Sequence, residues 1–375
     1  MKVALFTETF LPKVDGVVTI IKQMIERMQY HGITPIIFAP PTAPKSYMEV
    51  PVYPSWGMRF LLYPELHFSF PSPQGIKAIV DFQPDIIHVM NPTFIGAVGT
   101  IMSQIGNVPL IGSVHMDIDT YVTQYAGAWG LPIAWAYFRL WHNRAAVNLA
   151  PSTATLQQIT KHGIQRGQHW QRGIDLTRFR RLPRNQDMRA RLTNNHPDDL
   201  LLLYVGRLSK EKGVQQLHNL CMLPRVRVAL VGGGPQESEM KRFFADTDAH
   251  FTGILTGQEL IDAYNAADVF VFPSQSETFG LAPLEAMACG LPVIAPFAGG
   301  LRDTIQDGVN AIIYEPTQPQ SLVDAVIKLR DNPHIRMQLS QQAHTYAQQK
   351  SWQASMDQLI EIYRDLYASQ GRSRR

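Results

Sequence analysis

The chain has 375 residues, of which 45% are hydrophobic and 17% charged, and its net charge is +3. This composition is typical of a soluble globular enzyme, and the length predicts two domains. No apolar run approaches the roughly 20 residues of a membrane-spanning helix, and the residues after Met1 become polar too early for a signal peptide. We therefore expect a cytoplasmic protein in which Cys221 and Cys289, which lack metal-ligand spacing, are reduced thiols.

In the amino half, short apolar segments alternate with helical stretches, which is typical of a buried parallel sheet. A helix is expected after the first strand, at 17–30, because its apolar residues recur at helical spacing. The expected strands are residues 3–7, 35–38, 85–89 and 109–114.

The carboxyl half repeats this alternation, and a final helix is expected at 351–367, where apolar residues line one face. Residues 185–198 are polar and without apolar periodicity, so they predict a linker between the two halves. The expected strands of this half are residues 200–205, 226–231, 268–272 and 292–295.

The fold class expected from this pattern is α/β, with two Rossmann-like, doubly wound parallel-sheet domains facing across a deep cleft. Ligands of such sheets bind outside the carboxyl ends of the strands. The motifs described next all follow predicted strands, so we expect them to line that cleft.

Glu277 and Glu285 stand eight residues apart, with a loop between them and the start of a helix at 283–287. That spacing slightly exceeds two helical turns, so both carboxylates can face one groove. A helix amino end also attracts phosphate. Carboxylates for hydroxyls beside a phosphate-binding helix end predict a nucleotide-sugar pocket.

The loop 206–213 follows a strand and contains Arg207 and Lys212, whose charges suit a diphosphate. The alternative is an ordinary exposed basic loop. Gly233 lies in a second glycine-rich loop, where the backbone can approach a ligand closely, although a plain turn explains it equally. Neither half opens with the dinucleotide-binding glycine pattern.

The amino half offers further candidates. Gly16 lies where a loop meets a helix, and its N–H can approach a phosphate; turn chemistry is the alternative. His115 ends a predicted strand and can bind a sugar hydroxyl, although a lone histidine is often structural. Asp117 and Asp119 match a metal-binding Asp-x-Asp pattern, but Arg207 and Lys212 already supply positive charge. We therefore expect no metal and no cofactor, with Asp117 contacting sugar or acceptor.

Residues 161–191 hold nine lysines and arginines against two acids. This segment is either solvated chain between the domains or a basic strip facing an anionic donor or lipid. Arg172 belongs to it, and would bind an anionic substituent if it lined the cleft. Nucleic acid is not an expected partner, because no reading motif accompanies the charge.

Two aromatic segments, 56–63 and 121–141, carry many large apolar side chains. Core packing is the default explanation for most of them. Exposed members would instead dip into a bilayer interface or line an acyl-chain groove.

Taken together, these motifs resemble the retaining glycosyltransferases of family 4, which have the GT-B fold. The resemblance implies that Arg207 and Lys212 bind the diphosphate, Glu285 the ribose and Glu277 the donor sugar. It also implies that the final helix returns to the first domain, giving domains 1–184 with 351–375, and 199–350. The other implied donor-site residues are Gly16, Gly233, Phe279, Gly280 and Leu281, with His115 completing the site.

Two subgroups of this family look similar. Residues 6–16, 170–175 and 187–192 resemble sulfoquinovosyldiacylglycerol synthases, whereas 142–146, 149–153 and 277–279 resemble GDP-mannose-dependent α-mannosyltransferases. Residues 113–117 depart from the first subgroup's usual His-Thr-His. The first subgroup implies transfer of sulfoquinovose from UDP-sulfoquinovose to diacylglycerol, and the second implies transfer of mannose to a glycolipid. Both imply a lipid acceptor and peripheral contact with the inner face of the membrane.

Two rival functions remain. A nucleotide-sugar epimerase shares the two-domain fold but needs an acid and a base, for which only His115 offers itself. A nucleotide-sugar-binding regulator would bind the donor without making product. For a transferase, Arg207, Lys212, His115 and Glu277 are the expected catalytic residues.

Overall fold

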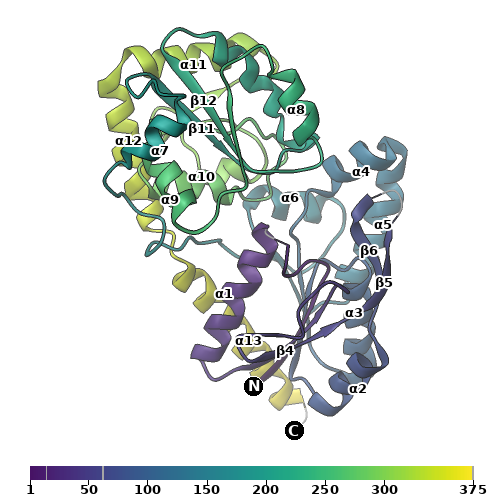
Figure 1. The fold of residues 1–375 in the computed structure, drawn as a ribbon. Coiled ribbons are helices and arrows are strands. Elements are labelled where there is room, and N and C mark those ends of the chain that lie inside the picture. The colour runs from purple at the N-terminus through teal and green to yellow at the C-terminus, as the bar shows by residue number, and fades with distance from the viewer. Residues whose placement is uncertain (14, 61–62, 374–375) are drawn as a thin grey trace. The chain divides into compact units, whose positions relative to one another are not determined.

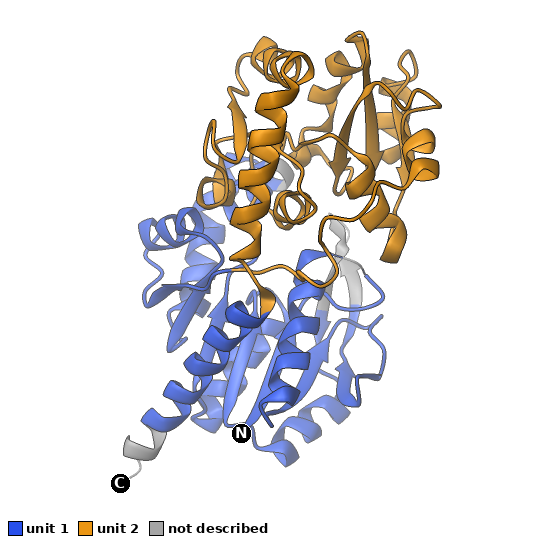
Figure 2. Ribbon diagram, turned by 90° about the vertical axis from the view of Figure 1, so that its left-hand side faces the viewer, with its two compact units in different colours: residues 1–171, 353–375 blue, residues 172–352 orange. Residues whose placement is uncertain are grey.

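The computed structural model of the protein describes residues 1–13, 15–60 and 63–373 (Figure 1). The chain forms two compact units. Unit 1 comprises Met1–Gln171 and Gln353–Arg375, and unit 2 comprises Arg172–Trp352 (Figure 2). The last segment of the chain therefore belongs to the first unit.

Unit 1 is built on an eight-stranded sheet with the order β10-β9-β8-β7-β1-β2-β4-β3. All neighbouring strands pair in parallel except β3 with β4. The predicted strands are confirmed to within a residue or two. The strands are β1 (Lys2–Thr7), β2 (Thr34–Ala39), β3 (Ser46–Tyr47), β4 (Val50–Pro54), β7 (Ile86–Met90), β8 (Leu110–Ser113), β9 (Val147–Ala150) and β10 (Gly167–His169).

Helices cover both faces of this sheet. Ile79 and Ile95 pack into one cluster with Val89 of β7, whereas His88, the adjacent residue of β7, hydrogen-bonds Tyr363 at 2.7 Å. Successive strand residues point to opposite faces. The helices are α1 (Gly16–Tyr30), α2 (Pro73–Phe82), α3 (Ile95–Gly106), α4 (Ile118–Ala126), the 3₁₀ turn η1 (Ala128–Gly130), α5 (Leu131–His142), α6 (Thr153–Lys161) and α13 (Trp352–Ser373).

The aromatic segment 56–63 contributes to an antiparallel hairpin of β5 (Trp56–Phe60) and β6 (Tyr63–Phe70). Residues 61 and 62 of this segment lie outside the described residues. Trp56 is exposed, so the default of core packing does not hold for this side chain.

Unit 2 is built on a six-stranded parallel sheet with the order β13-β12-β11-β14-β15-β16. Its four predicted strands are confirmed, because buried parallel strands are apolar along their whole length. The strands are β11 (Leu200–Val205), β12 (Val226–Val231), β13 (His250–Gly253), β14 (Val269–Val271), β15 (Val293–Pro296) and β16 (Ala311–Tyr314).

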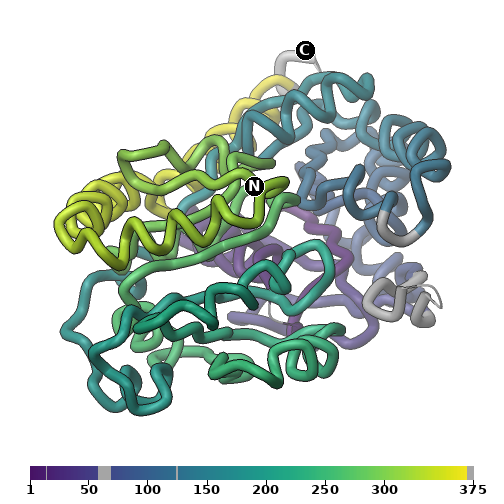
Figure 3. The backbone as a smooth tube through the Cα atoms, turned by 90° about the horizontal axis from the view of Figure 1, so that it is seen from above, coloured from purple at the N-terminus to yellow at the C-terminus, as the bar shows by residue number. Residues whose placement is uncertain are grey.

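The helices of unit 2 flank this sheet, and α11 and α12 follow each other directly near the end of the unit (Figure 3). The α-helices are α7 (Gln186–Leu192), α8 (Glu237–Phe243), α9 (Gly257–Ala266), α10 (Leu281–Ala288), α11 (Pro319–Asp331) and α12 (Pro333–Gln348). The 3₁₀ segments are η2 (Lys210–Lys212), η3 (Val214–Met222) and η4 (Gly299–Asp303). Among the described helices of the whole chain, none combines the length and apolarity needed to cross a bilayer.

The structure differs from the expected linker at 185–198, where residues 186–192 form helix α7. Met188 and Leu192 join the core of unit 2. Arg189 is 3% exposed, hydrogen-bonds three carbonyl oxygens and pairs with Asp268 at 2.7 Å. The helix was missed because much of its anchorage is a buried guanidinium rather than an apolar stripe.

The division between the units also falls earlier than residue 184, at Gln171 and Arg172. Phe179 packs edge-on against Tyr264, with ring centroids 5.8 Å apart, and the Leu182 N–H donates to Asn265 at 2.8 Å. These contacts attach residues 172–184 to unit 2.

Candidate active site

In the parallel sheet of unit 2, the order in which strands are added reverses between β11 and β14. The chain places β12 and β13 on one side of β11, and β14, β15 and β16 on the other. Loops at the carboxyl ends of two such strands leave room for a ligand. Lys212 follows β11 and Glu277 follows β14, and the Lys212 ammonium donates to the Glu277 carboxylate. Their side chains are only 20% and 13% exposed. Two residues predicted separately for the donor site are therefore paired at the reversal point.

The loop 206–213 has its own internal bonds. The Tyr204 hydroxyl donates to the Arg207 carbonyl at 2.9 Å, and the Ser209 hydroxyl donates to Glu211 at 2.5 Å. The pKa of Tyr204 is raised well above its usual value, chiefly by burial and further by Glu277 and Glu211. The tyrosine thus stays protonated and can keep fixing the backbone at Arg207.

Glycines bring the neighbouring loops of unit 2 into backbone contact. A Cβ on Gly232 would lie 1.9 Å from the Gly206 carbonyl oxygen, and one on Gly234 would lie 2.4 Å from that of Leu208. The Leu208 N–H donates to the Gly233 carbonyl at 3.0 Å. The predicted Gly233 loop therefore lies directly against the Arg207 loop.

Gly299 and Gly300 pack against the backbone of the Glu277 loop. Neither glycine was identified from the sequence. The Gly300 N–H donates to the Glu277 carbonyl at 2.6 Å. A Cβ on Gly299 would lie 2.3 Å from that carbonyl oxygen, and one on Gly300 would lie 2.2 Å from the carbonyl oxygen of Thr278. The adjacent glycines after β15 were the available signal, because only glycine permits such close approach.

Glu285 has a different environment from Glu277. It accepts a hydrogen bond of 2.7 Å from the Tyr264 hydroxyl. Burial raises its pKa to about 7, while the Tyr264 bond and the charge of Arg178 oppose that rise. The two glutamates predicted as a pair thus have separate partners, Lys212 for Glu277 and Tyr264 for Glu285.

Helix α10 begins beside this loop, at Leu281, after Gly280 with φ of 90°. Gly280 cannot cap the helix with a side chain, and Leu281–Leu284 carry no acid, so the first N–H groups keep their attraction for an anion. Phe279 is 9% exposed and belongs to the core of unit 2. Any ligand contact by Phe279 would therefore come from its backbone.

In unit 1 the strand order reverses between β1 and β7. Glu8 follows β1 directly and lies at this reversal. Its carboxylate accepts from the N–H groups of Phe94 at 2.6 Å and Gly96 at 3.1 Å, which begin helix α3. Burial raises the pKa of Glu8 to about 6, although these bonds oppose the rise. Glu8 was missed, because a cap supplied by a residue 86 positions away leaves no local pattern.

Gly16 is the exposed first residue of α1, and the adjacent Asp15 caps the helix by accepting from the Val18 N–H at 2.9 Å. His115 follows β8, and its N–H donates to the Asn91 side chain at 2.9 Å. The loops after β7 and β8 are thereby joined. These placements put both predicted residues at the carboxyl edge of the sheet in unit 1.

Asp117 caps helix α4, accepting from the Thr120 N–H at 3.2 Å and its hydroxyl at 2.8 Å. Gln158 donates to both Asp117 and Asp119, and Trp135 donates to Asp119 at 2.6 Å. Both carboxylates of the Asp-x-Asp motif thus serve internal bonds. Among the described residues, no three histidine, cysteine or acidic side chains are grouped to hold a metal ion.

Arg172 is 1% exposed, so it is not part of a solvated strip. Burial lowers its pKa to about 9, which leaves the guanidinium charged at neutral pH. Other members of the 161–191 segment, including Lys161 and Arg166, are exposed, so the segment contains two kinds of basic residue.

Comparison with known proteins assigns both halves of the chain. Residues 14–178 match the family described as Glycosyltransferase Family 4, and residues 186–346 match Glycosyl transferases group 1. A GDP-mannose-dependent alpha-mannosyltransferase of Mycobacterium tuberculosis is 33% identical over 371 residues, covering 97% of this chain and 96% of that protein. The chain belongs to the family 4 glycosyltransferases. It is therefore a glycosyltransferase, as its motifs predicted.

Two further proteins resemble this glycosyltransferase. Sulfoquinovosyl transferase SQD2 of Arabidopsis thaliana is 36% identical over 272 residues, which cover 71% of this chain and 53% of the plant protein. The match thus spans about half the length of that relative. The solved structure of a sucrose-phosphate synthase from Thermosynechococcus elongatus has a TM-score of 0.81 at 22% identity, covering 98% of this chain and 99% of that one. The expected GT-B fold is confirmed.

Proposed function

We propose that this glycosyltransferase moves a sugar from a nucleotide-diphosphate donor to a membrane lipid, with retention of configuration at the anomeric carbon. Sulfoquinovose from UDP-sulfoquinovose, transferred to diacylglycerol, is the first candidate reaction. Support comes from the resemblance of residues 6–16 and 170–175 to sulfolipid synthases and from the identity with sulfoquinovosyl transferase SQD2.

The observation that carries the donor site is the Lys212–Glu277 pair at the strand reversal of unit 2. A diphosphate can take the Lys212 ammonium and the Arg207 guanidinium, while the uncapped start of α10 offers N–H groups. The Glu277 carboxylate is then available to sugar hydroxyls. Glu285, held by Tyr264, is assigned to the ribose.

In the proposed reaction, the bond between the anomeric carbon and the phosphate oxygen breaks as the acceptor hydroxyl bonds to the same face of that carbon. The acceptor's proton passes to the departing diphosphate, and no enzyme carboxylate forms a covalent bond. Arg207 and Lys212 stabilise the growing negative charge, which is the main electrostatic task. Because these cations neutralise the diphosphate, a chelator is expected to leave the transfer rate unchanged.

Mannose transfer from GDP-mannose to a glycolipid is the second candidate. It is favoured by the mannosyltransferase relative that matches nearly the whole chain. The two candidates share their donor chemistry and their lipid acceptor, and they differ in base and sugar.

A thermal-shift panel of UDP- and GDP-sugars, including UDP-sulfoquinovose and GDP-mannose, separates them. A ligand that binds only the folded state at 100 times its Kd stabilises it by about 2.7 kcal/mol. The largest shift is expected with UDP-sulfoquinovose; a shift with GDP-mannose alone would reject the sulfolipid reaction.

Two product assays test the reaction type. Incubation with the preferred donor and no acceptor should give no new sugar isomer, whereas an isomer would indicate an epimerase. Addition of diacylglycerol should then give a glycolipid. Tight donor binding without product, whatever lipid is supplied, would indicate a regulator.

A further inference from the structure

Helix α5 of unit 1 carries apolar side chains on two opposite faces. On the inner face, Trp135 and Phe138 are buried in an apolar cluster. On the outer face, apolar residues recur at helical spacing and stay in water, which packing within the unit does not explain. We call this outer set the α5 stripe; it consists of Ile133, Tyr137 and Leu140 of α5 with Trp129 of the preceding turn η1, which are 65%, 37%, 51% and 74% exposed.

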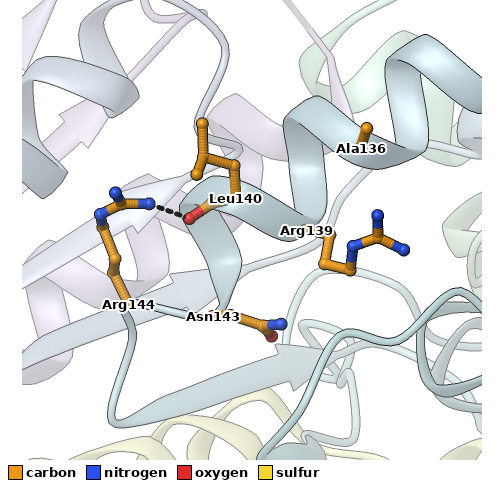
Figure 4. A pocket seen from close by; sticks show the side chains of 5 residues that line it. All are labelled: Ala136, Arg139, Leu140, Asn143 and Arg144. Carbon is orange, nitrogen blue, oxygen red and sulfur yellow. Dashed lines mark hydrogen bonds between the residues drawn. The ribbon is translucent and has the colours of Figure 1, made fainter.

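Positive charge borders the α5 stripe. Arg139 and Arg144 line an open hollow of about 430 Å³ together with Leu140 (Figure 4). Lys161 is exposed at the end of α6, and the next residue, His162, stacks on Trp135 of α5 with ring centroids 3.9 Å apart. The sequence contains no aspartate or glutamate from residue 120 to residue 174. Of the acids just before this stretch, Asp119 is bound by Trp135 and Gln158.

We propose that the α5 stripe docks on the surface of an anionic lipid bilayer. This inference rests on the proposed lipid acceptor and names the surface that reaches it. Tryptophan and tyrosine favour the bilayer interface, an exposed apolar helix face can lie in it, and arginine or lysine beside it attracts anionic headgroups. A second copy of the chain is a poorer occupant, because the basic borders of two identical stripes would repel each other.

The α5 stripe is tied to the loops that carry His115. The Tyr137 hydroxyl donates to the carbonyl of Thr93 in the loop after β7, and the same loop provides Asn91, which holds the His115 N–H. Trp135 reaches Asp119 of α4, and α4 begins three residues after His115. A lipid headgroup at the docked surface is therefore brought to this edge of unit 1.

Sedimentation of the full-length protein with vesicles tests the proposal. We expect binding to mixed phosphatidylglycerol and phosphatidylcholine vesicles and weak binding to phosphatidylcholine alone. The double variant Ile133→Ser with Leu140→Ser should lower the partition coefficient about tenfold or more. The matched control, Val309→Ser with Met337→Ser, removes apolar groups of unit 2 that are 45% and 66% exposed, and should bind as the wild type does.

A charge variant tests the basic border separately. Arg139→Gln with Lys161→Gln should lower binding to the anionic vesicles about tenfold and reduce its dependence on salt. Arg144 is left intact because its guanidinium donates to the Leu140 carbonyl at the end of α5.

Three results would overturn the inference: no vesicle binding by the wild type, equal binding by the Ile133→Ser, Leu140→Ser variant, or a wild-type dimer that this variant converts to monomer. The donor-induced thermal shift is measured on the same samples and should be unchanged. Loss of vesicle binding with an intact donor shift separates failure of the docking surface from failure of the proposed donor chemistry.

Discussion

The two units carry the same topological feature and use it differently. In each sheet the strand order reverses beside the first strand of the unit, between β1 and β7 in unit 1 and between β11 and β14 in unit 2. In unit 1 the reversal is filled by the Glu8 carboxylate, which binds the first N–H groups of α3. In unit 2 it carries the Lys212–Glu277 ion pair beside the uncapped start of α10.

With the proposed donor site in unit 2, one architecture would serve both as a scaffold and as a ligand site. A carboxylate at a helix amino end satisfies the same N–H groups that a phosphate would. Unit 1 therefore supplies its own anion at the reversal, whereas the reversal in unit 2 holds Lys212 and a helix start without a side-chain cap, where we propose that the anionic donor binds. The four predictions below test this contrast, from the largest expected effect to the smallest.

Lys212→Ala should lower turnover by about 10²- to 10³-fold, because it removes a cation from the growing charge on the diphosphate. Its melting temperature should fall by only a few degrees, since Glu277 loses one partner at a partly exposed site. The control is Lys210→Ala, an exposed lysine of the same loop. Near-normal transfer by folded Lys212→Ala protein would remove the proposed mechanism.

Gly299→Ala should weaken donor binding about tenfold, because the new Cβ would lie 2.3 Å from the Glu277 carbonyl oxygen and displace that loop. Gly308→Ala is the matched control. Its φ of 69° imposes a similar backbone cost, but no atom lies within 4 Å of the new Cβ. Titration calorimetry with the preferred donor compares the two, and equal affinities would show that Gly299 does not position Glu277.

Glu285→Gln should raise the melting temperature at pH 8 while weakening donor binding. The wild-type pKa is raised from 4.5 to about 7, so its stabilising protonation is fully present below pH 4.5 and is lost as the pH rises to about 7. The Glu285→Gln variant has no titrating carboxyl at this position. Its gain in melting temperature over the wild type should therefore grow between pH 4.5 and about 7 and stay constant above that. Glu259→Gln, at an exposed acid, is the control; a pH-independent difference would contradict the assignment.

Glu8→Ala should lower the free energy of unfolding by about 1–2 kcal/mol, because the first N–H groups of α3 lose their acceptor. Urea unfolding measures this loss, with the exposed Glu26→Ala of α1 as the control. The donor-induced thermal shift should persist, because most of the predicted donor-site residues, including Lys212, Glu277 and Glu285, lie in unit 2. If Glu8→Ala weakened donor binding as much as Lys212→Ala does, the two strand reversals would not differ in function.

The sequence predicted the strands well because buried parallel strands are apolar throughout and need no partner to be recognised. It named Lys212 and Glu277 individually but not their pairing, which depends on the strand order. Glu8 and Arg189 were not predicted because they bind backbone groups of residues distant in the chain, Phe94 and Ala266. Such contacts leave no local pattern in the sequence. Ile133 and Phe138 show the remaining difficulty: similar apolar residues of one helix differ in exposure, and composition does not separate them.

The discontinuity of unit 1 has a consequence for synthesis on the ribosome. Trp170 donates to the Ser355 carbonyl at 2.9 Å, and His88 meets Tyr363, so one face of the first sheet needs residues translated after all of unit 2. Unit 2 is continuous in the chain and can complete its fold first. Until α13 is made, the part of this face that it covers stays exposed in nascent unit 1, and exposed apolar surface of this kind favours chaperone binding.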